Sequence, residues 1–176
     1  MNPSSCLKLS ACLAYALPVL VAAGLAAPAH AATIERIYQQ NAASTCQGAL
    51  PAFAGTLRAR PLGVGNEGAA PTFLTCSFTR EGPFDQPVTR VSLHFTNNAD
   101  AAVTINCTGV FGQQRDETVY LPKSVVVEPG EFGNIAWSAV DNDGNDLPGP
   151  GNSSCSLPPG AVMLDTFNYF DVEIGS

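Results

Sequence analysis

The stretch from Val88 to Val110 constrains the fold more than any other part of the chain. Apolar side chains occupy every second position on both sides of an Asn/Asp-rich break at residues 97–100: Val91, Leu93, Phe95, Val103, Ile105 and Cys107. A period of two is typical of a β-strand with one buried face. Two such runs around a short polar break predict a β-hairpin.

Similar short segments recur along the rest of the chain and are separated by Gly, Pro, Asn and Asp. We expect strands within 53–60, 72–79, 119–128, 134–140, 155–157 and 161–174. Residues 61–71 and 141–154 are expected to be loops, residues 128–131 a type II turn, and residues 33–40 a loosely held N-terminal segment. No internal repeat is evident. The pattern predicts an all-β, antiparallel β-sandwich of seven to nine strands with hairpin or Greek-key connections. We expect the core to contain Phe78, Val91, Leu93, Phe95, Ile105, Val126 and Trp137.

The first 31 residues have the features of a signal peptide. Lys8 precedes an uncharged Ala/Leu/Val run, and Ala29-His30-Ala31 is a small-x-small cleavage site. An uncleaved membrane anchor is the alternative. Removing 31 of the 176 residues leaves a single predicted domain, residues 32–176, with seven Lys/Arg and fifteen Asp/Glu and so a net charge of −8. This charge disfavours nucleic acid as a partner, and no apolar run after residue 31 predicts membrane insertion.

Four cysteines remain after cleavage: Cys46, Cys76, Cys107 and Cys155. An even number of cysteines in an exported chain predicts disulfides, here two. Of the three pairings we favour Cys46–Cys76 with Cys107–Cys155, which do not cross in sequence. Each would stabilise the fold by roughly 3–4 kcal/mol. Zinc is the alternative, but no two cysteines are close in sequence.

One acidic loop is a candidate calcium site. Asp141, Asp143 and Asn145 match the first three ligand positions of an EF-hand loop, and Asp146 is a further oxygen donor. The match then fails, because Asp146 stands where the loop needs glycine and Asn152 where it needs a bidentate Glu. The alternative is a solvated loop with Asx turns.

No catalytic set converges in the sequence. His94 is the one histidine of the mature chain, and it lies mid-strand without a Gly-x-Ser-x-Gly motif. Candidate carboxylates for glycoside hydrolysis are Glu117, Glu128, Glu131 and Asp165. Near the C-terminus, Phe167 and Tyr169 are expected on one strand face and Phe170 on the other.

The motifs resemble a group of exported β-sandwich proteins from Gram-negative bacteria. They are Ala-Ser-Thr-Cys at 43–46, Phe-Thr-Asn-Asn at 95–98, Asn-Cys-Thr at 106–108 and Cys-Ser-Leu-Pro-Pro-Gly at 155–160. That group is uncharacterised in activity. The resemblance implies the fold and the exported location, and it supplies no catalytic residues.

The sequence therefore predicts an exported, periplasmic or extracellular, non-enzymatic binding or structural module with a protein or glycan partner. The alternatives are a small secreted hydrolase that uses carboxylates, and a calcium-stabilised adhesive or pilus-type subunit. In the pilus alternative, residues 33–40 would be the donor strand.

Overall fold

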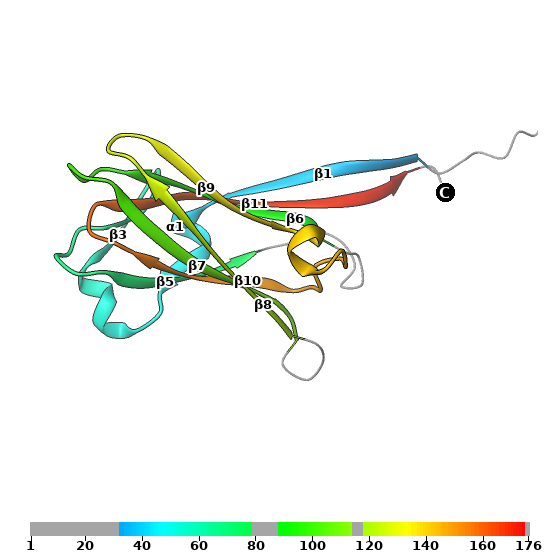
Figure 1. The fold of residues 1–176 in the computed structure, drawn as a ribbon, viewed down its shortest axis with the longest axis horizontal. Coiled ribbons are helices and arrows are strands. Elements are labelled where there is room, and N and C mark those ends of the chain that lie inside the picture. The colour runs from blue at the N-terminus through cyan, green and yellow to red at the C-terminus, as the bar shows by residue number, and fades with distance from the viewer. Residues whose placement is uncertain (1–31, 79–87, 114–117, 175–176) are drawn as a thin grey trace, which may run out of the picture.

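The computed structural model describes residues 32–78, 88–113 and 118–174. Within these ranges, eleven strands form two antiparallel sheets that pack face to face (Figure 1). The predicted antiparallel β-sandwich is confirmed, with more strands than the seven to nine expected. In the described ranges no helix is long and apolar enough to cross a membrane.

The six-stranded sheet has the order β3-β4-β11-β6-β9, and β1 pairs with β11 beside β4. Its strands are β1 (Ala32–Asn41), β3 (Leu57–Arg60), β4 (Gly63–Asn66), β6 (Val88–Asn97), β9 (Phe132–Ser138) and β11 (Ala161–Ile174). The five-stranded sheet has the order β2-β5-β10-β7-β8. Its strands are β2 (Cys46–Gly48), β5 (Thr72–Phe78), β7 (Val103–Gly112), β8 (Thr118–Val127) and β10 (Gly151–Leu157). Three short helices complete the fold: α1 (Ala42–Thr45), η1 (Pro51–Gly55) and η2 (Ala139–Asn142).

The predicted hairpin between residues 88 and 110 is wrong, although both of its strands exist. β6 pairs with β9 and β11, whereas β7 pairs with β8 and β10 in the other sheet. The break at 97–100 turns the chain across the core instead of folding one strand back on the other. A hairpin and a crossing between two sheets give the same alternation of apolar and polar residues, because each strand buries one face in either arrangement.

The side chain of Asn97 builds this corner. Asn97 is fully buried; its Nδ2 donates to Ala101 O at 2.8 Å and to Val127 O at 2.9 Å, and its Oδ1 accepts from the Ala99 N–H at 2.8 Å. The bond to Val127 O reaches from the end of β6 to the end of β8. One asparagine therefore fixes the loop and joins the two sheets.

The corner between β4 and β5 repeats this arrangement at Asn66. Its Nδ2 donates to Ala70 O at 2.9 Å and to Leu157 O at 2.8 Å, and its Oδ1 accepts from the Gly68 N–H at 2.9 Å. As at Asn97, the asparagine side chain bonds the N–H of residue i+2, the C=O of residue i+4 and a C=O at the end of a strand in the opposite sheet. The fold thus contains an internal structural repeat that the sequence did not reveal.

A Pro-Gly turn returns the chain beside each corner. The Gly130 N–H donates to Asn97 O at 2.8 Å, and the Gly160 N–H donates to Asn66 O at 2.9 Å. Both glycines have positive φ, 76° and 81°, which agrees with the type II turn predicted at 128–131.

The core lies between the sheets and is centred on Trp137, which is fully buried. All predicted core residues except Val126 are buried. Val126 is 61% exposed and Val127 takes the inward position, so the face of β8 was wrongly assigned. Gly109 lies beneath Trp137, where a Cβ would come within 2.9 Å of the indole ring and 2.7 Å of Phe111.

Several segments expected to be irregular are strands. Residues 33–40 are not loosely held, because β1 pairs with β11 along its whole length. They occupy the chain's own sheet, so they are not a free donor strand in this structure. Residues 61–71, expected to be a loop, contain β4, and β10 begins at Gly151 inside the expected loop 141–154. The reverse holds for residues 53–60, which were expected to be a strand: they begin within η1, and β3 begins only at Leu57. The long C-terminal strand β11 supplies the backbone partners of β1 and β4, whereas β10 pairs with β5 and β7.

Both favoured disulfides are present. Cys46 pairs directly with Cys76 across β2 and β5, and Cys107 pairs with Cys155 across β7 and β10. Both lie in the five-stranded sheet and link neighbouring strands. Disulfides are typical of proteins in oxidising compartments such as the periplasm and the extracellular space.

The open side of the sandwich, between β8 and β9, is closed by two bonds from side chains to backbone carbonyls. Trp137 Nε1 donates to Leu121 O at 2.7 Å, and Lys123 Nζ donates to Ala136 O at 2.6 Å. These bonds hold the edge strands of the two sheets together.

Candidate functional site

The outer face of the five-stranded sheet carries rows of small polar side chains. Register places Phe73, Ser156, Asn106 and Ser124 side by side across β5, β10, β7 and β8. The next row is Thr75, Ser154, Thr108 and Pro122. Four strands about 4.8 Å apart give each row a span of about 14 Å. We call these eight residues the polar face.

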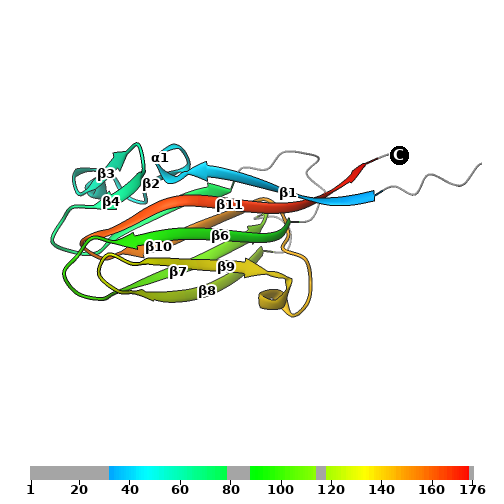
Figure 2. The same ribbon diagram turned by 90° about the horizontal axis from the view of Figure 1, so that it is seen from above.

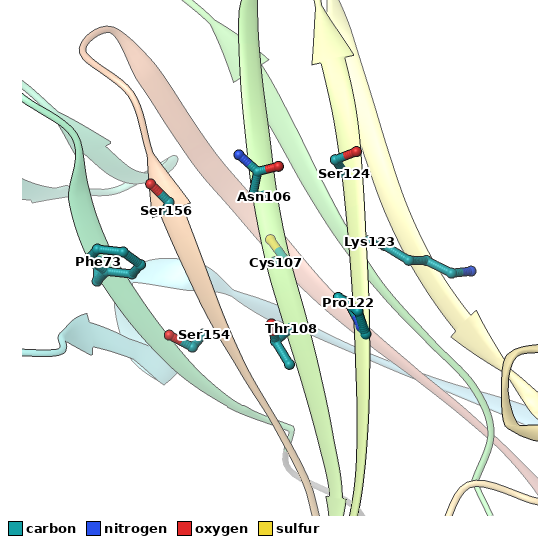
Figure 3. A pocket seen from close by; sticks show the side chains of 9 residues that line it. All are labelled: Phe73, Asn106, Cys107, Thr108, Pro122, Lys123, Ser124, Ser154 and Ser156. Carbon is teal, nitrogen blue, oxygen red and sulfur yellow. The ribbon is translucent and has the colours of Figure 1, made fainter.

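All residues of the polar face except Thr75 line an open groove of about 560 Å³. The residues that line it come from four strands (Figure 3): Phe73, Asn106, Cys107, Thr108, Pro122, Lys123, Ser124, Ser154 and Ser156. Cys107 contributes from below, since it is buried in its disulfide. The lining contains neither a carboxylate nor an imidazole.

Lys123 is the one cation of this lining, and its ammonium group is directed away from the groove. It forms an ion pair with Asp141 Oδ1 at 2.5 Å in addition to its bond to Ala136 O. Figure 3 shows its side chain extending toward β9, away from the other labelled groups. The groove therefore presents hydroxyl and amide groups without a net charge.

Two exposed aromatic rings lie on this side of the five-stranded sheet, Phe73 within the polar face and Tyr120 beside it. Phe73 is 49% exposed and contacts Phe53 of η1, with ring centroids 6.3 Å apart. Tyr120, on β8, is 65% exposed. The sequence analysis did not select either ring. The signal that could have found these rings is an aromatic residue at an outward-facing position of a predicted strand.

The predicted C-terminal aromatics lie on the other sheet. Phe170 is buried, whereas Phe167 and Tyr169 are partly exposed on the outer face of the six-stranded sheet, as the period predicted. The Phe167 ring lies 4.5 Å from His94 and 6.5 Å from Tyr169, and the guanidinium of Arg90 lies over Tyr169 at 5.3 Å. These side chains cover one another and form no groove with the polar face.

His94 is held in the middle of this aromatic group. Burial lowers its pKa from the ordinary value; the charge of Asp165 opposes the shift, and Arg90 adds to it. Asp165 is the strand neighbour of His94. Glu128 and Glu131 lie at the β8–β9 turn and Glu117 falls outside the described residues, so the structure does not gather the candidate carboxylates around a shared cleft.

The candidate calcium ligands follow β9, and two of them, Asp141 and Asn145, have side-chain partners within the protein. Asp141 Oδ2 accepts from the Ser138 N–H at 2.9 Å, while Oδ1 faces Lys123. Burial acts to raise the pKa of Asp141, but the bonds from Lys123 and Ser138 outweigh it and hold the pKa below its ordinary value. Asp143 has φ 53°, and Asn145 Nδ2 donates to Asn142 O at 3.1 Å.

Within the described ranges, no group of three or more His, Cys, Asp and Glu side chains is placed to hold a metal ion. Asn and backbone oxygens are outside that set, so the calcium prediction at Asp141, Asp143, Asn145 and Asp146 stays a prediction.

No protein-family model matches the chain, and no curated protein matches it. Solved structures to which the chain is similar include the xylan-binding module CBM15, with a TM-score of 0.41 and 7% identity over 77% of this chain and 96% of that module. Another is exo-beta-1,3-galactanase from Phanerochaete chrysosporium, with a TM-score of 0.42 and 12% identity over 76% of this chain. TmCBM61 in complex with beta-1,4-galactotriose has a TM-score of 0.32 and 12% identity over 78% of this chain and 88% of that one. The match spans 29% of the galactanase. At these scores the likeness carries no argument about ligand or activity.

Proposed function

We propose that this chain is an exported, non-catalytic binding module that holds a neutral polysaccharide on its polar face. The observation that carries the proposal is the groove of about 560 Å³ floored by Ser, Thr and Asn side chains, with Phe73 at its edge. Hydroxyl and amide groups both donate and accept hydrogen bonds, and sugar hydroxyl groups need both. An exposed ring offers an apolar surface to the C–H face of a sugar.

Charge favours a neutral glycan over an acidic one. The ammonium group of Lys123 is paired with Asp141, and the chain after residue 31 carries a net charge of −8. A polymer of uronic acids or a nucleic acid would meet repulsion without a free cation in the groove lining.

The composition of the groove favours binding over hydrolysis. Glycoside hydrolysis uses two carboxylates that flank the bond to be cleaved. The groove lining contains none, and Glu128, Glu131 and Asp165 lie elsewhere in the fold.

Affinity is expected to be modest. A net hydrogen bond contributes about 1 kcal/mol, and an open groove leaves one side of the ligand in water. A total of about 4–8 kcal/mol corresponds to a Kd between about 1 mM and 1 μM. Affinity gel electrophoresis detects binding in this range.

The test is electrophoresis in gels that contain xylan, mixed-linkage β-glucan, galactan, galactomannan or, as the acidic probe, polygalacturonate. The wild-type chain should be retarded by at least one neutral polymer and not by polygalacturonate. Phe73→Ala and Asn106→Ala should each lose at least five-fold in affinity. Phe132→Ala is the matched control, because Phe132 is a 76% exposed ring on the opposite sheet.

Two results would contradict the proposal. One is the absence of retardation by every neutral polymer; the other is retardation that Phe73→Ala leaves unchanged and Phe132→Ala abolishes. Release of reducing sugar from any of these polymers by the purified chain would favour the hydrolase alternative.

A further inference from the structure

We propose that two copies of this chain associate edge to edge through β1, in an antiparallel pairing centred on Ile37. The two six-stranded sheets would then form one continuous sheet across a two-fold axis. This inference does not depend on the proposed glycan function, because the polar face belongs to the other sheet.

Among the residues that the structure describes, β1 is a long sheet edge with backbone groups that no strand uses. All ten of its residues pair with β11 on one side, and among the described residues none pairs with the other side. Figure 2 shows β1 as the outermost strand beside β11, β6 and β9. In an antiparallel ladder alternate residues direct their N–H and C=O groups to opposite sides, so about half of these groups face outward. Such an edge is a template for another strand.

The other edges of the sandwich are short or blocked. β2 has three residues, and β3 has four, two of which are the charged Arg58 and Arg60. In β8, Pro122 lacks an N–H group and Leu121 O is occupied by Trp137. In β9, Ala136 O is occupied by Lys123. β1 contains no proline, no glycine and no register shift.

Symmetry limits how β1 can pair with a second β1. Side chains that lie opposite each other across an antiparallel pair point to the same face, and a two-fold axis normal to the sheet preserves faces. The axis must therefore lie midway between the two copies of one residue, so that this residue is opposite itself. Centring on Glu35 or Arg36 would place identical charges opposite each other, which is unfavourable.

Centring on Ile37 avoids both repulsions and gives almost complete overlap. Residues 33–41 of each copy then pair, with Ile37 opposite Ile37, Arg36 opposite Tyr38 and Glu35 opposite Gln39. In this register no like charges lie directly opposite each other.

Ile37 is the exposed apolar residue that this register covers. It is 57% exposed on the outer face, opposite Tyr169 of its own sheet, whose ring lies under Arg90. In the dimer the two Tyr169–Ile37 rows become one apolar row across the axis. A second copy of the chain can supply both a strand that pairs with the edge of β1 and an isoleucine that packs against Ile37.

The test is sedimentation equilibrium of the oxidised chain, purified after export, from about 1 μM to about 1 mM. A single strand-to-strand contact is smaller than a stable interface of about 800 Å² per partner, so the dimer is expected in the upper part of this range. The weight-average mass should rise toward twice that of one chain.

Charge substitutions at the axis give the decisive comparison. Ile37→Lys and Ile37→Glu each place two like charges opposite each other and should remain monomeric throughout. An equimolar mixture of the two variants pairs Lys with Glu and should form a heterodimer at lower concentration than the wild type. Phe132→Lys, at an exposed ring on β9, is the matched control and should dimerise like the wild type.

Amide hydrogen exchange supplies a readout that needs no variant. Alternate amides of β1 should become protected as the wild-type concentration rises. A wild-type chain that stays monomeric at about 1 mM with concentration-independent exchange in β1 would overturn the proposal. So would a dimer that survives Ile37→Lys.

Discussion

Replacing Asn97 by alanine tests whether one side chain fixes the crossing between the sheets. The change removes three hydrogen bonds, to Ala101 O, Val127 O and the Ala99 N–H. Since Asn97 is fully buried, water does not easily replace the lost partners.

The expected loss follows from the number of bonds. At about 1 kcal/mol per net hydrogen bond, three bonds amount to about 3 kcal/mol, and an unsatisfied carbonyl in the interior adds to this. A change of 1 kcal/mol moves the Tm of a domain of this size by about 3 °C, so we expect a decrease of about 9 °C. Asn97→Asp should be worse at pH 7 than at pH 3, because an ionised carboxylate would face Ala101 O and Val127 O.

The assay is thermal unfolding followed by circular dichroism, with urea unfolding for the free energy. Asn98→Ala is the control, since Asn98 is exposed and the substitution keeps its backbone N–H, which donates to Gly160 O. Asn66→Ala should reproduce the effect at the equivalent corner. If Asn97→Ala lowers the free energy of unfolding no more than Asn98→Ala does, the asparagine corners do not stabilise the fold.

Three further predictions concern the disulfide framework and the loop after β9. Replacing Cys107 and Cys155 together by alanine should reduce the free energy of unfolding by about 4 kcal/mol, measured in urea, because the bridge closes a loop with a sequence separation of 48. Asp141→Asn should destabilise at pH 7, and the difference from the wild type should shrink as pH falls below about 4. The reason is that the pKa of Asp141 is lower in the folded than in the unfolded chain, so its ionised form stabilises the fold above the unfolded pKa. This stabilisation is lost as pH falls through the folded pKa, and a pH-independent difference in Tm would contradict it. If the 141–146 loop binds calcium as its sequence predicts, Ca²⁺ at about 100 times its Kd should stabilise by about 2.7 kcal/mol relative to EDTA, and Asp143→Ala should abolish the shift. Coincident melts would refute the calcium prediction.

Much of the local structure was predictable because it depends on residues that are close in sequence. Leu74, Cys76 and Phe78 of β5 are buried as their alternation implied, and so are Ile135 and Trp137 of β9. The turn at Pro129-Gly130 was also predictable, since its backbone angles follow from its own two residues.

The strand partners were not predictable in the same way. β6 and β7 alternate as a hairpin would, but an asparagine at the end of β6 finds its acceptor on β8, which lies 30 residues along the chain. Continuing the period of two from Phe95 places Asn97 on the inward face and Asn98 on the outward face, but nothing local indicates which backbone carbonyl of another strand Asn97 meets. The same holds for β1, whose weak pattern became a full strand only because β11 offered it a partner.

The candidate site depends wholly on the tertiary structure. The register across four strands places Phe73, Asn106, Ser124 and Ser156 in one row, and no local pattern links these four positions in the sequence.

The sequence by itself determined which face of most strands is buried and where the Pro-Gly turns lie, because burial periodicity and backbone preferences are properties of neighbouring residues. It predicted two disulfides and favoured one of three pairings, and the structure decided that this pairing forms. Only the tertiary structure decided which strands pair, which sheet each joins and where the groove lies. The physical reason is that a period of two requires a buried face but does not specify the surface that buries it.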